Sequence, residues 1–265
     1  MHGVITPRSG GGAVSRSIVV VKIGGSVLTG SNGYRRAAEF LADRVAADPR
    51  DAIVAVVSAE LGVTDALLGI ARDFADAPDP AALDLLWSTG ELRSTALLAL
   101  ALQARDVAAG AVNVHQAGLV KADGPGRVQI RALRLHAVLA AHDVVVAPGF
   151  LARGRGDGIV SLGRGGSDLS AVLLAIGLGA RRCELLKDVP GYFSADPKLE
   201  PHAVPIPALD YDRALLMSDE GCDLVQRAAL EAARDHGLEL IVSAIGGGPG
   251  TLVTTNNIHF ESAVA

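Results

Sequence analysis

Leu162-Gly-Arg-Gly-Gly-Ser-Asp-Leu-Ser-Ala-Val172 is a glycine-rich turn that carries an arginine and an aspartate and opens onto the apolar run Leu173–Leu178. Glycines let a backbone approach a ligand closely, and the free N–H groups at a helix start favour an anion. Arg164 can fork onto a carboxylate or phosphate, and Asp168 can receive an ammonium group. The alternative is an ordinary loop followed by a helix that Ser167 or Asp168 caps. The stretch alone leaves both interpretations open.

Outward from this turn, short β-branched runs alternate with helix-patterned segments. We expect strands at Ser17–Ile23, Asp51–Ser58, Ala111–Val114, Asp143–Ala147, Cys183–Leu186, Leu238–Ser243 and Thr251–Val253. We expect helices at Tyr34–Ala47, Ala66–Phe74, Ala81–Arg105, Arg131–Ala141, Tyr211–Ser218 and Asp223–His236, with a hairpin tip at Arg153–Asp157. The alternation predicts an α/β fold with a mostly parallel sheet that is covered on both faces. Ligands bind such sheets at the carboxyl ends of the strands, where Lys22, Ser58 and Arg164 lie.

Lys22 is a charge inside the apolar run of the first strand, and Gly24 and Gly25 follow it. Its side chain either extends out of the strand end into solvent or reaches the oxygens of a phosphate. The motif is not a P-loop, because the lysine precedes the glycines and no Gly-Lys-Ser/Thr follows.

Gly90 interrupts the helical pattern of Ala81–Arg105. A glycine inside a helix lowers the stability of that helix by up to about 1 kcal/mol relative to alanine. Close approach of a ligand or of another helix would explain it. Glu91 then faces that site; the alternative is a surface glutamate.

Composition excludes several classes of function. The 265 residues carry a formal net charge of −5, which argues against a nucleic-acid-binding protein. The sequence also lacks a basic amphipathic segment of the kind that binds membrane surfaces. No apolar run is long enough to span a bilayer. Cys183 and Cys222 form neither a metal-binding spacing nor a disulfide framework, so we expect a cytoplasmic, reducing location and no protein-held metal. Residues 1–16 lack the apolar core of a signal peptide and are expected to be a flexible extension; residues 256–265 are expected to be a tail.

Several motifs, in this order along the chain, resemble the amino acid kinase family, and within it the catalytic domains of aspartokinases. They are Lys22-Ile-Gly-Gly-Ser26, Val57-Ser-Ala with Gly62-Val-Thr-Asp65, Ser88-Thr-Gly-Glu91, Gly163-Arg-Gly-Gly-Ser-Asp168, Asp188-Val-Pro-Gly191 and Ala195-Asp-Pro197. The resemblance implies a three-layer α/β/α sandwich around a mainly parallel eight-stranded sheet. It implies one domain over residues 17–255, with an acceptor lobe at about 17–180 and a nucleotide lobe at about 181–255.

The resemblance also implies a reaction: phosphoryl transfer from ATP, with Mg²⁺, to the side-chain carboxylate of aspartate or a closely related amino acid. Lys22 and Asp168 would be the catalytic residues, and a homodimer or higher homo-oligomer is expected. The acceptor would be bound by Ser58, Thr64, Glu91, Arg164, Gly166 and Ser167. The nucleotide would be bound by Lys22, Gly24, Gly25, Ser26, Lys187, Asp188, Phe193, Lys198 and Asp223.

The chain departs from the aspartokinase pattern at the nucleotide side. Asp223 stands where aspartokinases usually have a lysine that serves the ATP phosphates, and Lys187 replaces a threonine. An aspartate beside a triphosphate repels it unless it holds Mg²⁺. We hypothesise that Lys187 or Arg227 restores the missing positive charge.

Smaller departures accompany this one. Phe193 replaces a tyrosine, Lys198 replaces an arginine and so loses bidentate capacity, and Glu60 enters the substrate turn. Feedback inhibition through the regulatory domains of most aspartokinases is not expected. Three functions stay open: a kinase for aspartate or a related acid, a kinase of the same fold for another small acid, alcohol or phosphate, and a silent nucleotide-binding, metabolite-binding or partner subunit.

Overall fold

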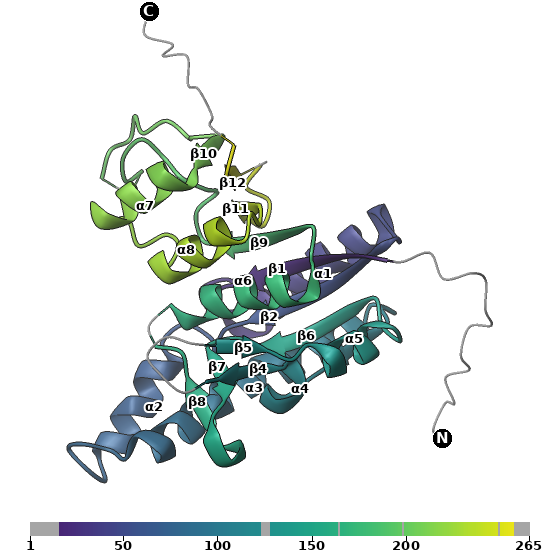
Figure 1. Cartoon of the computed structure of the whole chain (residues 1–265), viewed down its shortest axis with the longest axis vertical. Helices are drawn as coiled ribbons and strands as arrows, with labels where there is room; N and C mark the ends of the chain where they lie inside the picture. Colours follow the sequence, from purple (N-terminus) through teal and green to yellow (C-terminus); the bar gives the residue numbers. More distant parts are fainter. Residues whose placement is uncertain (1–15, 123–127, 164, 198, 249, 257–265) are drawn as a thin grey trace, which may run out of the picture.

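A computed structural model describes residues 16–256 except 123–127, 164, 198 and 249. Its centre is an eight-stranded sheet with the strand order β10-β12-β11-β9-β1-β2-β6-β3 (Figure 1). Paired strands are parallel throughout except for β11 and β12. The strands are β1 (Ser17–Ile23), β2 (Asp51–Val57), β3 (Ala109–Ala111), β6 (Val144–Pro148), β9 (Arg182–Lys187), β10 (Ala208–Asp210), β11 (Leu240–Ala244) and β12 (Thr251–Thr254).

Helices cover both faces of this sheet, which gives the three-layer α/β/α sandwich that the sequence predicted (Figure 1). The helices α1 (Gly30–Ala47) and α3 (Pro80–Gln103) pack on one face. The other face carries α4 (Val114–Ala117), α5 (Leu133–Leu139), α6 (Gly166–Leu178), α7 (Tyr211–Asp219) and α8 (Arg227–Asp235). The helix α2 (Val63–Arg72) packs against α3.

The alternation of side chains along β1 decides where the charge of Lys22 lies. Val19, Val21 and Ile23 belong to the core beneath α1 and α3, whereas Val20 belongs to the core beneath α6. Because successive side chains of a strand point to opposite faces, Lys22 shares the face of Val20. It therefore faces the layer that contains α6.

A second sheet of four short strands flanks the first, in the order β5-β4-β7-β8. Its strands are β4 (Leu119–Lys121), β5 (Val128–Ile130), β7 (Leu151–Arg153) and β8 (Ile159–Ser161). The hairpin tip expected at Arg153–Asp157 is confirmed: β7 and β8 pair antiparallel around a single 3₁₀ turn, η1 (Arg155–Asp157).

Three expectations about local structure are wrong. The strand placed at Ala111–Val114 ends at Ala111, because Asn113 and Gln116 form a capping box that starts α4. The segment treated as a loop, His115–Arg127, contains most of α4 and β4. The helix expected from Asp223 begins only at Arg227, because the backbone of Gln226 is not helical, with a ψ of 131°.

No helix among the described residues combines the length and the apolarity needed to cross a membrane.

Candidate functional site

Lys22 and Asp168 form a buried ion pair, with 2.9 Å between Nζ and Oδ1. Lys22 comes from the end of β1, and Asp168 lies in the first turn of α6. The left-handed backbone of Gly165 turns the chain into that helix, and a Cβ at this position would lie 3.0 Å from Cβ of Gln226. The two residues singled out as catalytic therefore lie side by side at the carboxyl end of the sheet.

A second lysine shares the same carboxylate. Lys187 Nζ lies 2.7 Å from Asp168 Oδ2, which also accepts a 3.3 Å hydrogen bond from the backbone N–H of Gln226. Burial alone would raise the pKa of Asp168, but the charges of Lys22 and Lys187 outweigh it and lower the pKa. Burial and the neighbouring Lys22 lower the pKa of Lys187. Two ammonium groups facing one carboxylate leave a net positive charge, which favours an anion.

The loop after β1 lies beside the Lys22 ammonium. A Cβ at Gly24 would be in ordinary van der Waals contact, 3.6 Å from Lys22 Nζ and 3.8 Å from Ser26 Oγ, so Gly24 and Ser26 both lie close to this group. The family resemblance implies that the N–H groups of Gly24 and Gly25 lie beside the transferred phosphate. The N–H of Gly24 instead donates to the carbonyl oxygen of Leu186, at 3.2 Å.

Gly25 joins this loop to the turn that follows β2. A Cβ at position 25 would lie only 2.2 Å from the carbonyl oxygen of Ala59, and Leu61 N–H donates to the Gly25 carbonyl at 3.1 Å. Only glycine permits this contact. The lysine loop and the expected substrate turn therefore form one wall.

Glu91 is buried, with 3% of its surface exposed, so the surface alternative is wrong. Burial raises its pKa to about 8, against the opposing effects of a hydrogen bond from the Ala59 backbone and the charge of Lys22. Among the described residues, its Oε2 atom has no hydrogen-bond partner. A Cβ at Gly90 would lie 3.0 Å from Val63 Cγ1, so close approach of α2 explains this glycine. A buried carboxyl with an unpaired oxygen suits a ligand that donates hydrogen bonds.

The remaining acceptor candidates lie on neighbouring elements. Ser58 follows β2 and donates its N–H to the Ile23 carbonyl, and Thr64 lies in the first turn of α2. Gly166 and Ser167 are buried at the start of α6. Arg164 lies outside the described residues.

The nucleotide candidates Lys187, Asp188, Phe193 and Asp223 line one cavity of about 670 Å³. This volume is within the range of small-molecule and cofactor sites. Lys198 lies outside the described residues. Sequence reasoning missed Arg213, which also lines the cavity; Asp210 caps the helix that presents it. Asp196 and Glu220 add acidic groups to the lining.

Arg227 does not line this cavity. Its half-exposed guanidinium pairs with Asp219 and with Glu231. Of the two residues hypothesised to replace the missing positive charge, only Lys187 lies between the cavity and Asp168.

No cluster of three or more His, Cys, Asp or Glu side chains suited to a metal ion occurs in the described part of the chain. A Mg²⁺ that arrives with a nucleotide needs only one or two protein carboxylates. Asp188, Asp196, Glu220 and Asp223 line the cavity separately and meet that requirement.

Comparisons with known proteins point to one family. A sequence model of the amino acid kinase family matches residues 17–243. The aspartokinase of Mycolicibacterium smegmatis is 33% identical over 255 residues, which cover 94% of this chain and 60% of that protein.

Solved structures give the same result. The aspartate kinase of Synechocystis has a TM-score of 0.82 at 33% identity and covers 94% of this chain and 41% of its own. E. coli aspartokinase III in complex with aspartate and ADP has a TM-score of 0.80 at 27% identity and covers 91% of this chain and 65% of its own. The chain thus spans about 60% of the length of the curated relative described above.

Proposed function

This chain belongs to the amino acid kinase family, and from that premise we propose that it transfers a phosphoryl group from ATP to the side-chain carboxylate of aspartate or a closely related amino acid. The observation that carries the proposal is the buried cluster of Lys22, Asp168 and Lys187. On one side it adjoins Glu91, which accepts a hydrogen bond from the Ala59 backbone, and on the other the cavity lined by Asp223.

Phosphoryl transfer demands alignment of the attacking and leaving oxygens and positive charge around the transferred group. A carboxylate is already a nucleophile, so no general base is needed. Lys22 and Lys187 supply the charge, and Asp168 holds both ammonium groups in place. Bound Mg²⁺ would neutralise further charge on the phosphate oxygens.

The acceptor contacts follow from the chemistry of an amino acid. Glu91 receives the ammonium group, whose charge favours the ionised carboxylate over the neutral form that burial stabilises. Ser58, Thr64, Gly166 and Ser167 supply hydrogen bonds around it, and we assign Arg164 to a substrate carboxylate. We assign the acceptor lobe to about residues 17–180 and the nucleotide lobe to about residues 181–255.

One observation favours a second candidate. Asp223 lines the cavity where a lysine is expected, so a member that binds nucleotide or metabolite without turnover is the alternative. The position of Lys187 favours the kinase, because it places an ammonium group at the same cavity.

A coupled assay of ADP release with aspartate, glutamate and other small acids tests the proposal. We expect turnover with aspartate or a close relative, and none in Lys22→Ala, whose melting temperature should stay near that of the wild type because Lys187 still pairs with Asp168. Near-normal turnover in Lys22→Ala would overturn the mechanism. No turnover with any acid, together with ATP binding in calorimetry, would favour the silent alternative.

Light scattering checks the homo-oligomer that the family resemblance implies.

A further inference from the structure

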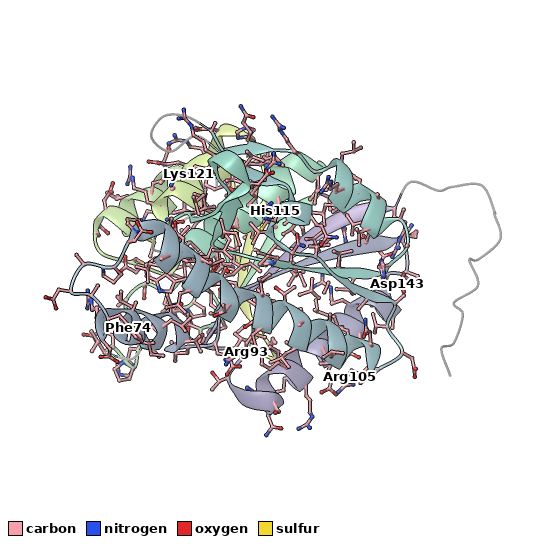
Figure 2. All side chains as sticks on the ribbon, turned by 90° about the horizontal axis from the view of Figure 1, so that it is seen from below. Phe74, Arg93, Arg105, His115, Lys121 and Asp143 are labelled. Atoms are coloured by element: carbon pink, nitrogen blue, oxygen red, sulfur yellow. The ribbon has the colours of Figure 1, made fainter. Side chains whose placement is uncertain are left out.

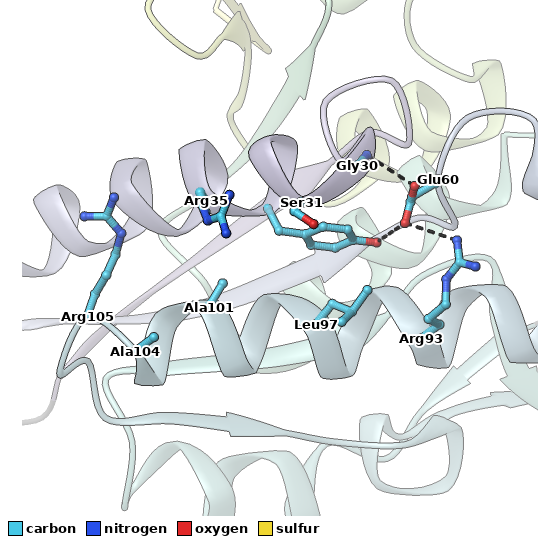
Figure 3. Close-up of a pocket in the computed structure, with 10 residues that line it drawn as sticks. Gly30, Ser31, Arg35, Glu60, Arg93, Leu97, Ala101, Ala104 and Arg105 are labelled. Carbon is cyan, nitrogen blue, oxygen red and sulfur yellow. Dashed lines mark hydrogen bonds and ion pairs between the residues drawn. The ribbon is translucent and has the colours of Figure 1, made fainter.

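A second cavity of about 660 Å³ lies in a groove between α1 and α3 (Figure 3). It shares no lining residue with the nucleotide cavity. Its floor is apolar and consists of Leu97, Ala101 and Ala104, all from the end of α3 and the residue after it.

Arginines dominate the charge of this groove. Arg35, Arg93 and Arg105 line it, and Glu60 is its single acidic lining residue. Arg35 donates to the neutral side chain of Asn32, and Arg105 pairs with Glu39 at 3.3 Å on the protein surface. The lining is therefore cationic and favours an anion.

Glu60 is already satisfied within the protein. Its Oε1 accepts from Tyr34 at 3.0 Å and from Arg93 at 3.1 Å, and its Oε2 accepts from the N–H of Gly30 at 3.3 Å. Burial raises the pKa of Tyr34 to about 12, so its hydroxyl keeps the donated proton at neutral pH. Glu60 offsets the charge of Arg93, and Glu39 offsets that of Arg105, so the groove keeps an excess of about one positive charge. Because a guanidinium carries five N–H donors, the two paired arginines still have N–H groups to offer a ligand.

The cations lie at the two ends of the groove. Arg35 and Arg105 lie toward one end and Arg93 toward the other, with Leu97 and Ala101 between them (Figure 3). Arg93 and Arg105 extend from the edge of α3 that borders α1 (Figure 2). At 1.5 Å per helical residue, the backbone positions 93 and 104 are roughly 16 Å apart. Two long arginine side chains can close on an extended ligand across this span.

We propose that the groove between α1 and α3 binds an elongated organic dianion, with an acidic group at each end of an apolar body. The acidic groups pair with Arg93 at one end and with Arg35 and Arg105 at the other, and the apolar body packs on Leu97 and Ala101. Guanidinium groups bind carboxylates through paired hydrogen bonds, which suits both ends.

Isothermal calorimetry with octanedioate, octanoate and 1,8-octanediol tests this site at low ionic strength. We expect octanedioate to bind most tightly, octanoate more weakly and the diol not measurably. Arg35→Gln and Arg105→Gln should each weaken octanedioate binding roughly three- to tenfold. Arg50→Gln is the matched control, because Arg50 is 81% exposed and lies outside the groove.

The same titration on Lys22→Ala separates this site from the phosphotransfer site. Octanedioate should bind Lys22→Ala as it binds the wild type, whether or not the wild type turns over any acid. Failure of octanedioate to bind the wild type, or equal binding by Arg35→Gln, Arg105→Gln and Arg50→Gln, would overturn the proposal.

Discussion

Asp168 is the residue on which both lysines of the site depend. It is almost fully buried, and without Lys22 and Lys187 its charge would be strongly unfavourable there. The resemblance to aspartokinases implies that Lys187 stands in place of a threonine and Asp223 in place of a lysine. It therefore implies that a positive charge at this cavity comes from the end of β9 instead of from position 223.

Lys187→Ala should lower kcat/KM roughly 10²- to 10³-fold, because it removes a preorganised charge from the transferred phosphate. Arg227→Ala should keep the rate of the wild type, because Arg227 pairs with Asp219 and Glu231 outside the cavity. Steady-state kinetics of both variants measure the difference. Unchanged activity in both would reject the idea that either residue supplies the missing charge.

Glu91 gives the stability of the protein a specific pH dependence. Its folded pKa of about 8 lies above the unfolded value of about 4.3. Its contribution to stability is therefore complete below about pH 4 and is lost as the pH rises through about 8. Glu91→Gln cannot ionise, so its unfolding free energy should rise relative to that of the wild type by on the order of a few kcal/mol between pH 5 and 9.

Urea unfolding at several pH values measures this effect. Glu39→Gln is the control, because the Glu39 side chain is 58% exposed, and it should change little with pH. A constant difference in unfolding free energy between Glu91→Gln and the wild type over the whole pH range would contradict the raised pKa of Glu91.

With acceptor present, Glu91→Gln should raise KM more than it lowers kcat if Glu91 binds the substrate ammonium.

At the level of elements, the loop after β1 and the turn after β2 depend on one glycine. Gly25→Ala places a methyl group 2.2 Å from the Ala59 carbonyl, which neither backbone can accommodate without moving. We expect a loss of at least about 2 kcal/mol in stability and of most activity, because one segment follows Lys22 and the other holds Glu91 through the backbone of Ala59.

Gly69→Ala is a matched control in α2. A Cβ there meets nothing within 4 Å, and the position is helical. It should raise the unfolding free energy by about 0.5–1 kcal/mol. Thermal melts of the two variants give the comparison, and a Gly25→Ala protein with wild-type stability and activity would show that the contact is dispensable.

The long elements could be predicted from sequence, and the shortest could not. β1 and β2 are short, nearly continuous apolar runs because both of their faces are covered. Their length and their β-branched residues, rather than any alternation, identify them as strands. β4, β5 and β10 have three residues each, too few for any pattern, and only pairing with distant strands defines them. The start of α8 differs from the prediction for a similar reason: Gln226 has a non-helical backbone, and its N–H donates to the distant Asp168.

Across the whole molecule, the site arises where the carboxyl ends of β1, β2 and β9 meet the start of α6. The sequence predicted the residues of this edge because glycines and charges follow each strand. It left open whether Glu91 is buried and whether Lys187 or Arg227 supplies the charge, since both depend on how distant elements pack. Arg213 carried no signal, because it lies among other charges at an ordinary helix start.

The charge of the whole chain and the local charge of Asp223 can be separated by experiment. The formal net charge is −5, so a nucleotide meets a repulsive protein before it reaches the cavity. Asp223→Lys should tighten ADP binding roughly tenfold and make it depend less on Mg²⁺, because it replaces a repulsive cavity charge with an attractive one.

Asp212→Lys makes the same change in net charge at an exposed position of α7 that does not line the cavity, and should alter ADP affinity less than twofold. Calorimetry with and without Mg²⁺ measures both variants. Equal effects of the two substitutions would show that the net charge of the molecule, and not Asp223, limits nucleotide binding.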